Sequence, residues 1–91
     1  MPTYVIEREI PGAGRLSAEE LRAISQKSVG VLSELAPSGI TWMHSYVTGD
    51  KIFCIYEASG VPIIEEHARC MGIPANRIYE VCATISPATA G

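Results

Sequence analysis

The centre of the chain, residues 40–58, reads ITWMHSYVTGDKIFCIYEA and carries the strongest evidence about its architecture. Residues 40–48 and 51–58 are rich in β-branched and aromatic side chains, a composition typical of β-strands. Gly49 and Asp50 lie between them and suit the two-residue turn of a β-hairpin. The stretch is therefore predicted to form two antiparallel strands.

The length of that turn decides which side chains share a face of the hairpin. A two-residue turn pairs Tyr46 with Phe53 and His44 with Ile55, and places Cys54 and Tyr56 on the opposite face. One additional residue in the turn would reverse this pattern and bring Cys54 beside His44. The sequence favours the register of the two-residue turn over this alternative.

The segments that flank the hairpin are predicted to be helices. Ser17 is followed three residues later by Glu20, the pattern of a capping box at a helix start, and Pro37 and Gly39 would end this helix. The second helix is expected to begin after Ser59, as its cap, and to end at Gly72.

Two outer strands complete the pattern, one over residues 3–9 and one over residues 78–85. The order strand, helix, strand, strand, helix, strand predicts an α+β, ferredoxin-like fold, with a four-stranded antiparallel sheet and two helices on one face. Residues 1–91 are expected to form a single domain, in which residues 86–91 are a frayed tail.

The composition narrows the classes of function. Of the 91 residues, 47% are hydrophobic and 19% are charged, whereas an average domain has about 25% charged residues. Such apolarity in a small domain predicts a homodimer. A net charge of −3 without a basic cluster argues against nucleic acid as a partner.

The same composition predicts the location of the protein. The sequence has no run of about 20 apolar residues, so no membrane association is expected. A charged start that does not resemble a signal peptide predicts a cytoplasmic location. The three cysteines, Cys54, Cys70 and Cys82, form no Cys-x-x-Cys pair and are expected to be reduced and mostly buried.

The sheet face away from the helices is the first place where function is expected. Alternation along strand 40–48 puts Trp42, His44 and Tyr46 on one side. Glu7, Glu9, Phe53 and Glu80, and Cys82 as a further candidate, are the other residues expected on this open face.

Two compatible interpretations follow for the open face. In one, the aromatic residues form a dimer interface, with carboxylates at its rim paired to Arg8 or Arg77. In the other, His44 and the neighbouring carboxylates bind a divalent metal, because imidazole suits nickel, zinc and copper.

His67 is the second histidine and lies in the predicted second helix. One interpretation is a histidine at the edge of the apolar stripe, hydrogen-bonded to a backbone carbonyl. The other is a metal ligand that acts with Glu66 or Cys70, which lie close to it on a helix.

Several short motifs occur in a fixed order along nearly the whole chain: Val5-Ile6-Glu7-Arg8-Glu9, Pro11-Gly12-Ala13-Gly14, Trp42-Met43-His44-Ser45-Tyr46-Val47-Thr48, Cys54-Ile55-Tyr56, Glu66-His67-Ala68-Arg69 and Gly72-Ile73-Pro74-Ala75-Asn76-Arg77-Ile78. With these motifs the chain resembles a family of small bacterial proteins, known as a domain of unknown function, that includes a nickel-binding protein. The resemblance implies a ferredoxin-like dimer and nickel binding in at least one member. The matched positions that could ligate a metal are Glu7, His44, Tyr46, Cys54, Glu66 and His67, whereas Met43 and Cys70 depart from the family pattern.

The leading hypothesis is a cytoplasmic, homodimeric, nickel-binding protein that is not primarily catalytic. Its metal ligands are predicted to be His44, Glu7, Tyr46 and His67. One alternative is a small dimeric enzyme, an oxidoreductase or isomerase, with a cavity lined by His44, Tyr46 and Trp42. Another alternative is an interaction module without a ligand.

Overall fold

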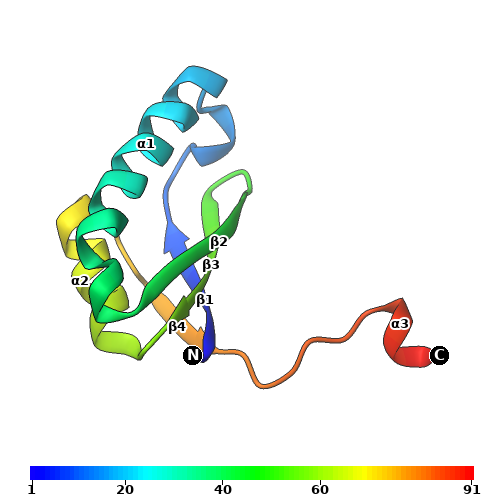
Figure 1. The fold of residues 1–91 in the computed structure, drawn as a ribbon. Coiled ribbons are helices and arrows are strands. Elements are labelled where there is room, and N and C mark those ends of the chain that lie inside the picture. The colour runs from blue at the N-terminus through cyan, green and yellow to red at the C-terminus, as the bar shows by residue number, and fades with distance from the viewer.

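The computed structural model describes residues 1–91, and its elements follow the predicted order. Figure 1 shows two helices packed on one side of a sheet. The strands are β1 (Thr3–Glu9), β2 (Ile40–Val47), β3 (Lys51–Ala58) and β4 (Arg77–Glu80); the helices are α1 (Ala18–Leu35), α2 (Val61–Met71) and the short α3 (Pro87–Ala90); two 3-10 turns, η1 and η2, cover Ala13–Arg15 and Ala36–Ser38.

The sheet has the strand order β2-β3-β1-β4, and every neighbouring pair is antiparallel. Helix α1 connects β1 to β2, and α2 connects β3 to β4; in each case one other strand lies between the two connected strands. The helices α1 and α2 lie side by side over the same face of the sheet. The predicted α+β, ferredoxin-like fold is confirmed. The opposite sheet face carries no helix, which leaves it as the open face.

The start of α1 confirms the predicted capping box. The Glu20 backbone N–H donates to the Ser17 hydroxyl at 3.0 Å, and the Ser17 backbone N–H donates to Glu20 Oε1 at 3.0 Å. The same contacts hold the pKa of the Glu20 carboxyl below its usual value, because they favour the charged form. The start of α2 differs from the prediction, since Gly60 rather than Ser59 occupies the cap position.

Replacing the capping hydroxyl is expected to weaken the fold measurably. Ser17→Ala should lower the free energy of unfolding by about 1 kcal/mol, because one helix N–H loses its partner. Urea denaturation followed by circular dichroism measures this change. Ser33→Ala, at an exposed position of the same helix, is the matched control and should change stability by less than about 0.5 kcal/mol. Equal effects of the two substitutions would contradict the capping role.

The hairpin adopts the register expected for a two-residue turn. Tyr46 pairs with Phe53 and His44 pairs with Ile55, so Cys54 and Tyr56 face the helices. An irregularity in β2 between Trp42 and His44 adds one residue, Met43, to this strand. Such a bulge reverses the alternation of side chains on one side of it.

The bulge corrects the predicted position of Trp42. Trp42 pairs with Tyr56 and faces the helices with it, whereas His44 and Tyr46 remain on the open face. Simple alternation placed all three together, but the additional residue shifts Trp42 to the other side.

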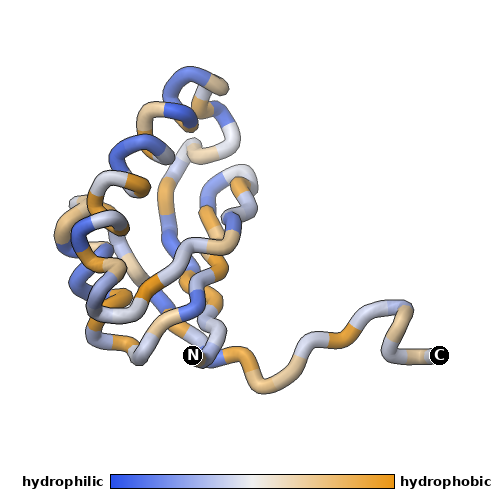
Figure 2. Tube along the Cα trace, viewed as in Figure 1, coloured by the Kyte–Doolittle hydropathy of each residue, from blue (hydrophilic) through white to orange (hydrophobic).

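The core lies between the helices and the sheet. Alternate residues of β1 and β3 point toward the helices and are buried, and Figure 2 shows hydrophobic segments both in the helices and in the sheet that they cover. Tyr4, Ile6, Tyr56 and Ala58 are at most 5% exposed, and Ile64 of α2 is completely buried against them.

The last strand is shorter than predicted. It ends at Glu80 because β1, its only neighbour, begins at Thr3, whose carbonyl accepts the last bond from the Val81 N–H at 2.8 Å. Register with β1 places Tyr79 on the open face and Glu80 on the side of the helices, which corrects the predicted position of Glu80.

The C-terminal segment leads away from the body of the domain after β4 and carries α3 (Figure 1). No helix of the chain has the length and apolarity that crossing a membrane would require.

Candidate functional site

The open sheet face brings His44 and Tyr46 together on edge strand β2. His44 Nε2 lies 3.1 Å from the Tyr46 hydroxyl, and the two rings pack edge to face with centroids 5.1 Å apart. Both side chains are exposed, and neither takes part in an ion pair. The arrangement presents an imidazole and a phenol side by side to anything that covers this face.

Glu7 lies on the same face but at a distance from His44. Its carboxylate forms an ion pair with Lys51 Nζ at 3.0 Å, and its side chain is only 14% exposed. Strand β3 separates β1 from β2, so the backbones that carry Glu7 and His44 are about 10 Å apart. Within one chain, Glu7 is therefore committed to Lys51 rather than to the histidine.

His67 lies on the other side of the sheet, in the interior. It is 1% exposed, its Nε2 lies 3.2 Å from the Ser28 hydroxyl of α1, and its ring packs 5.4 Å from that of Tyr56. Burial, with a smaller effect of the Arg8 charge, lowers the pKa of His67 to about 4. The side chain is a neutral, buried imidazole whose hydrogen-bond partner is a hydroxyl rather than the backbone carbonyl expected from sequence.

The predicted helical companions of His67 point away from it. Glu66 holds Arg69 in an ion pair on the exposed surface of α2, which keeps the pKa of the Glu66 carboxyl below its usual value. Cys70 is exposed and lies 3.7 Å from Glu66 Oε1. Of the three free cysteines only Cys54 is buried, which corrects the expectation that most of them are.

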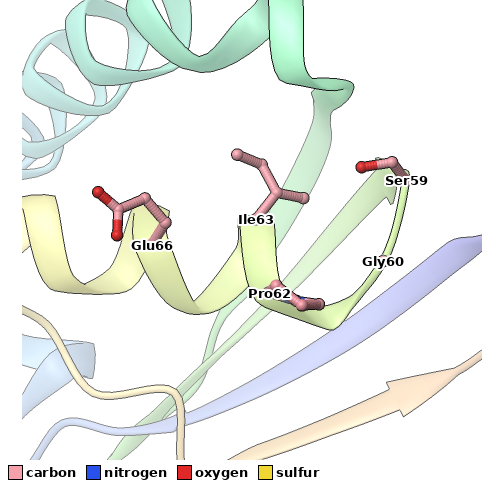
Figure 3. A pocket seen from close by; sticks show the side chains of 5 residues that line it. All are labelled: Ser59, Gly60, Pro62, Ile63 and Glu66. Atoms are coloured by element: carbon pink, nitrogen blue, oxygen red, sulfur yellow. The ribbon is translucent and has the colours of Figure 1, made fainter.

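A shallow hollow lies at the beginning of α2. Figure 3 shows Ile63 and Glu66 pointing to the same side of this helix, with Ser59 in the preceding turn. The hollow contains one carboxylate, which already binds Arg69. It therefore offers no set of metal ligands.

The predicted ligands thus occupy two faces of the sheet. His44, Tyr46 and Glu7 lie on the open face, and His67 lies inside. No group of three or more His, Cys, Asp or Glu side chains that could hold a metal ion is formed by one chain. The alternative cavity of His44, Tyr46 and Trp42 is not formed either, since Trp42 lines an interior cavity and the other two residues do not.

Arg8 lies in the interior, which corrects its predicted position. It was expected near the open face as a partner of carboxylates, but it is 1% exposed and points toward the helices. The signal was available, because Tyr4, Ile6 and Arg8 alternate along one side of β1. An arginine at the end of such an apolar row can therefore face the interior, although arginine is rarely buried.

Comparisons with known proteins agree with this architecture. The family described as "nickel responsive protein SCO4226-like" matches residues 4–81. The crystal structure of SCO4226 from Streptomyces coelicolor A3(2) is similar, with a TM-score of 0.75 and 14% sequence identity over 91% of this chain and 99% of that one. No curated protein matches the sequence. At this identity, the structural similarity supports the fold alone.

Proposed function

The chain belongs to the SCO4226-like family of nickel-responsive proteins, and on this premise we propose that it binds nickel as a cytoplasmic homodimer, with His44 as the principal ligand. The observation that carries the proposal is the exposed His44–Tyr46 pair on the open face. Imidazole nitrogen is a good ligand for nickel, and oxygen donors can complete its coordination shell.

One chain supplies only part of such a site. His44 offers a nitrogen and Tyr46 an oxygen, but Glu7 is paired with Lys51 and His67 faces the interior. The residues of a single chain therefore do not fit a complete nickel centre. A second copy is the most economical source of the remaining ligands, because a two-fold axis brings the same residues from both chains together.

The chemistry of the open face supports this role for a second copy. Val5, Phe53 and Ile55 are half-buried there without a helix above them, and Tyr46 and Tyr79 are 59% and 49% exposed. Aromatic residues are enriched in protein interfaces, and apolar surface gains free energy when it is covered. Two His44 side chains would then lie at the edge of a shared apolar surface.

Nickel titration of protein purified without a histidine tag tests the proposal. Isothermal titration calorimetry should show saturable binding, and His44→Ala should weaken the affinity at least about ten-fold, because ligand residues contribute no less than their supporting neighbours. His67→Gln is the matched control and should bind nickel as the original protein does.

Sedimentation velocity on the same samples measures the dimer. Equal nickel affinity of His44→Ala and the original protein would refute the site, and a monomer at all concentrations would refute the shared centre. A melting temperature that does not respond to nickel would favour the interaction module without a ligand.

A further inference from the structure

The interior of the domain contains a positive charge without a negative partner. Arg8 is 1% exposed, and its guanidinium carries a positive charge. The two ion pairs of the chain are Lys51–Glu7 and Arg69–Glu66, so neither involves Arg8. Buried charges in proteins are normally paired, which makes this arginine exceptional.

The hydrogen bonds of Arg8 are also incomplete. Its Nη1 donates to the Pro74 carbonyl at 2.8 Å, and its Nε donates to Cys54 Sγ at 3.4 Å. Its Nη2 has no partner, and neither does Nδ1 of His67. These two nitrogens are the only buried side-chain polar atoms in the chain that lack one, although such atoms are nearly always hydrogen-bonded.

Both residues line one cavity. It lies between α1 and the sheet and has a volume of about 390 Å³, within the usual range for small-molecule sites. Arg8, His67 and Tyr56 are among its buried residues, whereas Ile24, Lys27 and Val47 are exposed and form its rim. Eleven of the 17 lining residues are hydrophobic, and none is Asp or Glu.

We propose that this cavity binds a small organic monoanion, a carboxylate with an apolar body, which supplies the missing counter-ion of Arg8. Nη2 of Arg8 can donate to one carboxylate oxygen, and charge-assisted bonds of this kind are among the strongest in proteins. Trp42 and Ile52 provide apolar surface for the rest of the ligand.

The neutral polar groups of the cavity suit the same ligand. If the Ser28 hydroxyl donates to Nε2 of His67, then Nδ1 of the neutral ring is an N–H donor that a carboxylate can accept. Burial raises the pKa of Tyr56 to about 12, so its phenol also stays protonated. Arg8 is then the one interior cation, which favours a monoanion over a dianion.

The cavity is independent of the proposed nickel centre. It lies between the sheet and the helices, while His44 and Tyr46 lie on the opposite face. The failure of one proposal therefore leaves the other unaffected.

Binding of simple carboxylates tests the inference directly. Calorimetric titration of the full chain at pH 7.5 should show saturable binding of benzoate or octanoate. Benzamide, a neutral analogue of benzoate, should bind at least ten-fold more weakly. Arg8→Met should weaken carboxylate binding roughly 10- to 100-fold, the range for one hydrogen bond to a charged group. Arg22→Met removes an exposed cation from α1 outside the cavity and should change nothing.

A second variant keeps the test decisive if Arg8→Met does not fold. Ile24→Trp changes an exposed residue of the rim and should obstruct the cavity while Arg8 stays in place, so benzoate binding should again fall at least ten-fold. The proposal is overturned if neither carboxylate binds the original protein, if benzamide binds as well as benzoate, or if the Arg8→Met or Ile24→Trp protein binds normally.

Discussion

Acidification from pH 7 to pH 4 should lower the free energy of unfolding by up to about 3 kcal/mol through His67 alone. In the unfolded chain this imidazole takes up a proton near its ordinary pKa of 6.5, whereas in the folded protein burial and Arg8 lower its pKa to about 4. Between these values the unfolded state binds more protons. The stability is therefore fully present above pH 6.5 and decreases as the pH falls toward 4.

Urea denaturation at a series of pH values measures this dependence. Carboxyl groups also titrate in the lower part of the window, so the informative quantity is the difference between variants. His67→Gln should flatten the dependence between pH 6.5 and 4, because the side chain that must stay neutral is gone. His44→Ala removes an exposed imidazole from the other face of the sheet, and this variant should show the same pH dependence as the original protein. Parallel pH profiles for the original protein and His67→Gln would contradict the prediction.

Truncation of Ile6 should be the most damaging single substitution proposed for this chain. Ile6 is completely buried on the helix-facing side of the central strand β1, opposite Cys54 and Ile78. Ile6→Ala should lower the free energy of unfolding by about 4 kcal/mol, in the upper part of the range for such cavities, because strands on both sides restrict relaxation. A 91-residue domain has a total stability of roughly 5–14 kcal/mol, so this loss is a large share of it.

Val5→Ala provides a control that also reports on the open face. Val5 neighbours Ile6 in β1 but is half-buried on the side without helices. In dilute protein, Val5→Ala should lower the free energy of unfolding by less than half as much as Ile6→Ala does. If a second copy covers this face, the cost should increase with protein concentration, since association stabilises by mass action. Chemical denaturation at two protein concentrations distinguishes these cases, and equal losses for the two truncations would refute the assignment of faces.

The local features of the fold could be predicted because they depend on neighbouring residues. The capping box needs only Ser17 and Glu20, three residues apart, and the hairpin turn needs only the residues around Gly49. The register of the hairpin was predicted as one of two choices, because one additional residue in the turn would move each side chain of one strand to the other face of the hairpin. The structure has the register of the shorter turn.

The errors arose where distant strands decide the outcome. Strand β4 ends at Glu80 because β1 begins at Thr3 and does not extend further to pair with it, although residues 81–85 have the composition of a strand. The bulge at Met43 moves Trp42 to the interior, and the alternation of residues along strand β2 does not predict this bulge. In both cases the partner strand, rather than intrinsic propensity, determines which residues continue the ladder.

The candidate sites divide in the same way. The exposed pair His44–Tyr46 could be predicted, because two residues at positions i and i+2 of a regular strand share a face, and the bulge in β2 lies before this pair. The separation of His67 from His44 could not, because it depends on which side of the sheet α2 packs. The same packing brings Arg8 within hydrogen-bonding distance of Pro74, 66 positions away, without bringing an acidic residue with it.

The sequence by itself therefore determined the order of elements, the helix cap, the hairpin and the exposed His44–Tyr46 pair, all through contacts that are short in sequence. Only the tertiary structure decided that Arg8 and His67 meet in one cavity and that His44 stands on the other side of the sheet. The physical reason is that the burial and charge pairing of a side chain depend on every element packed around it. The hydrophobic periodicity of the sequence depends only on the one strand or helix that carries the side chain.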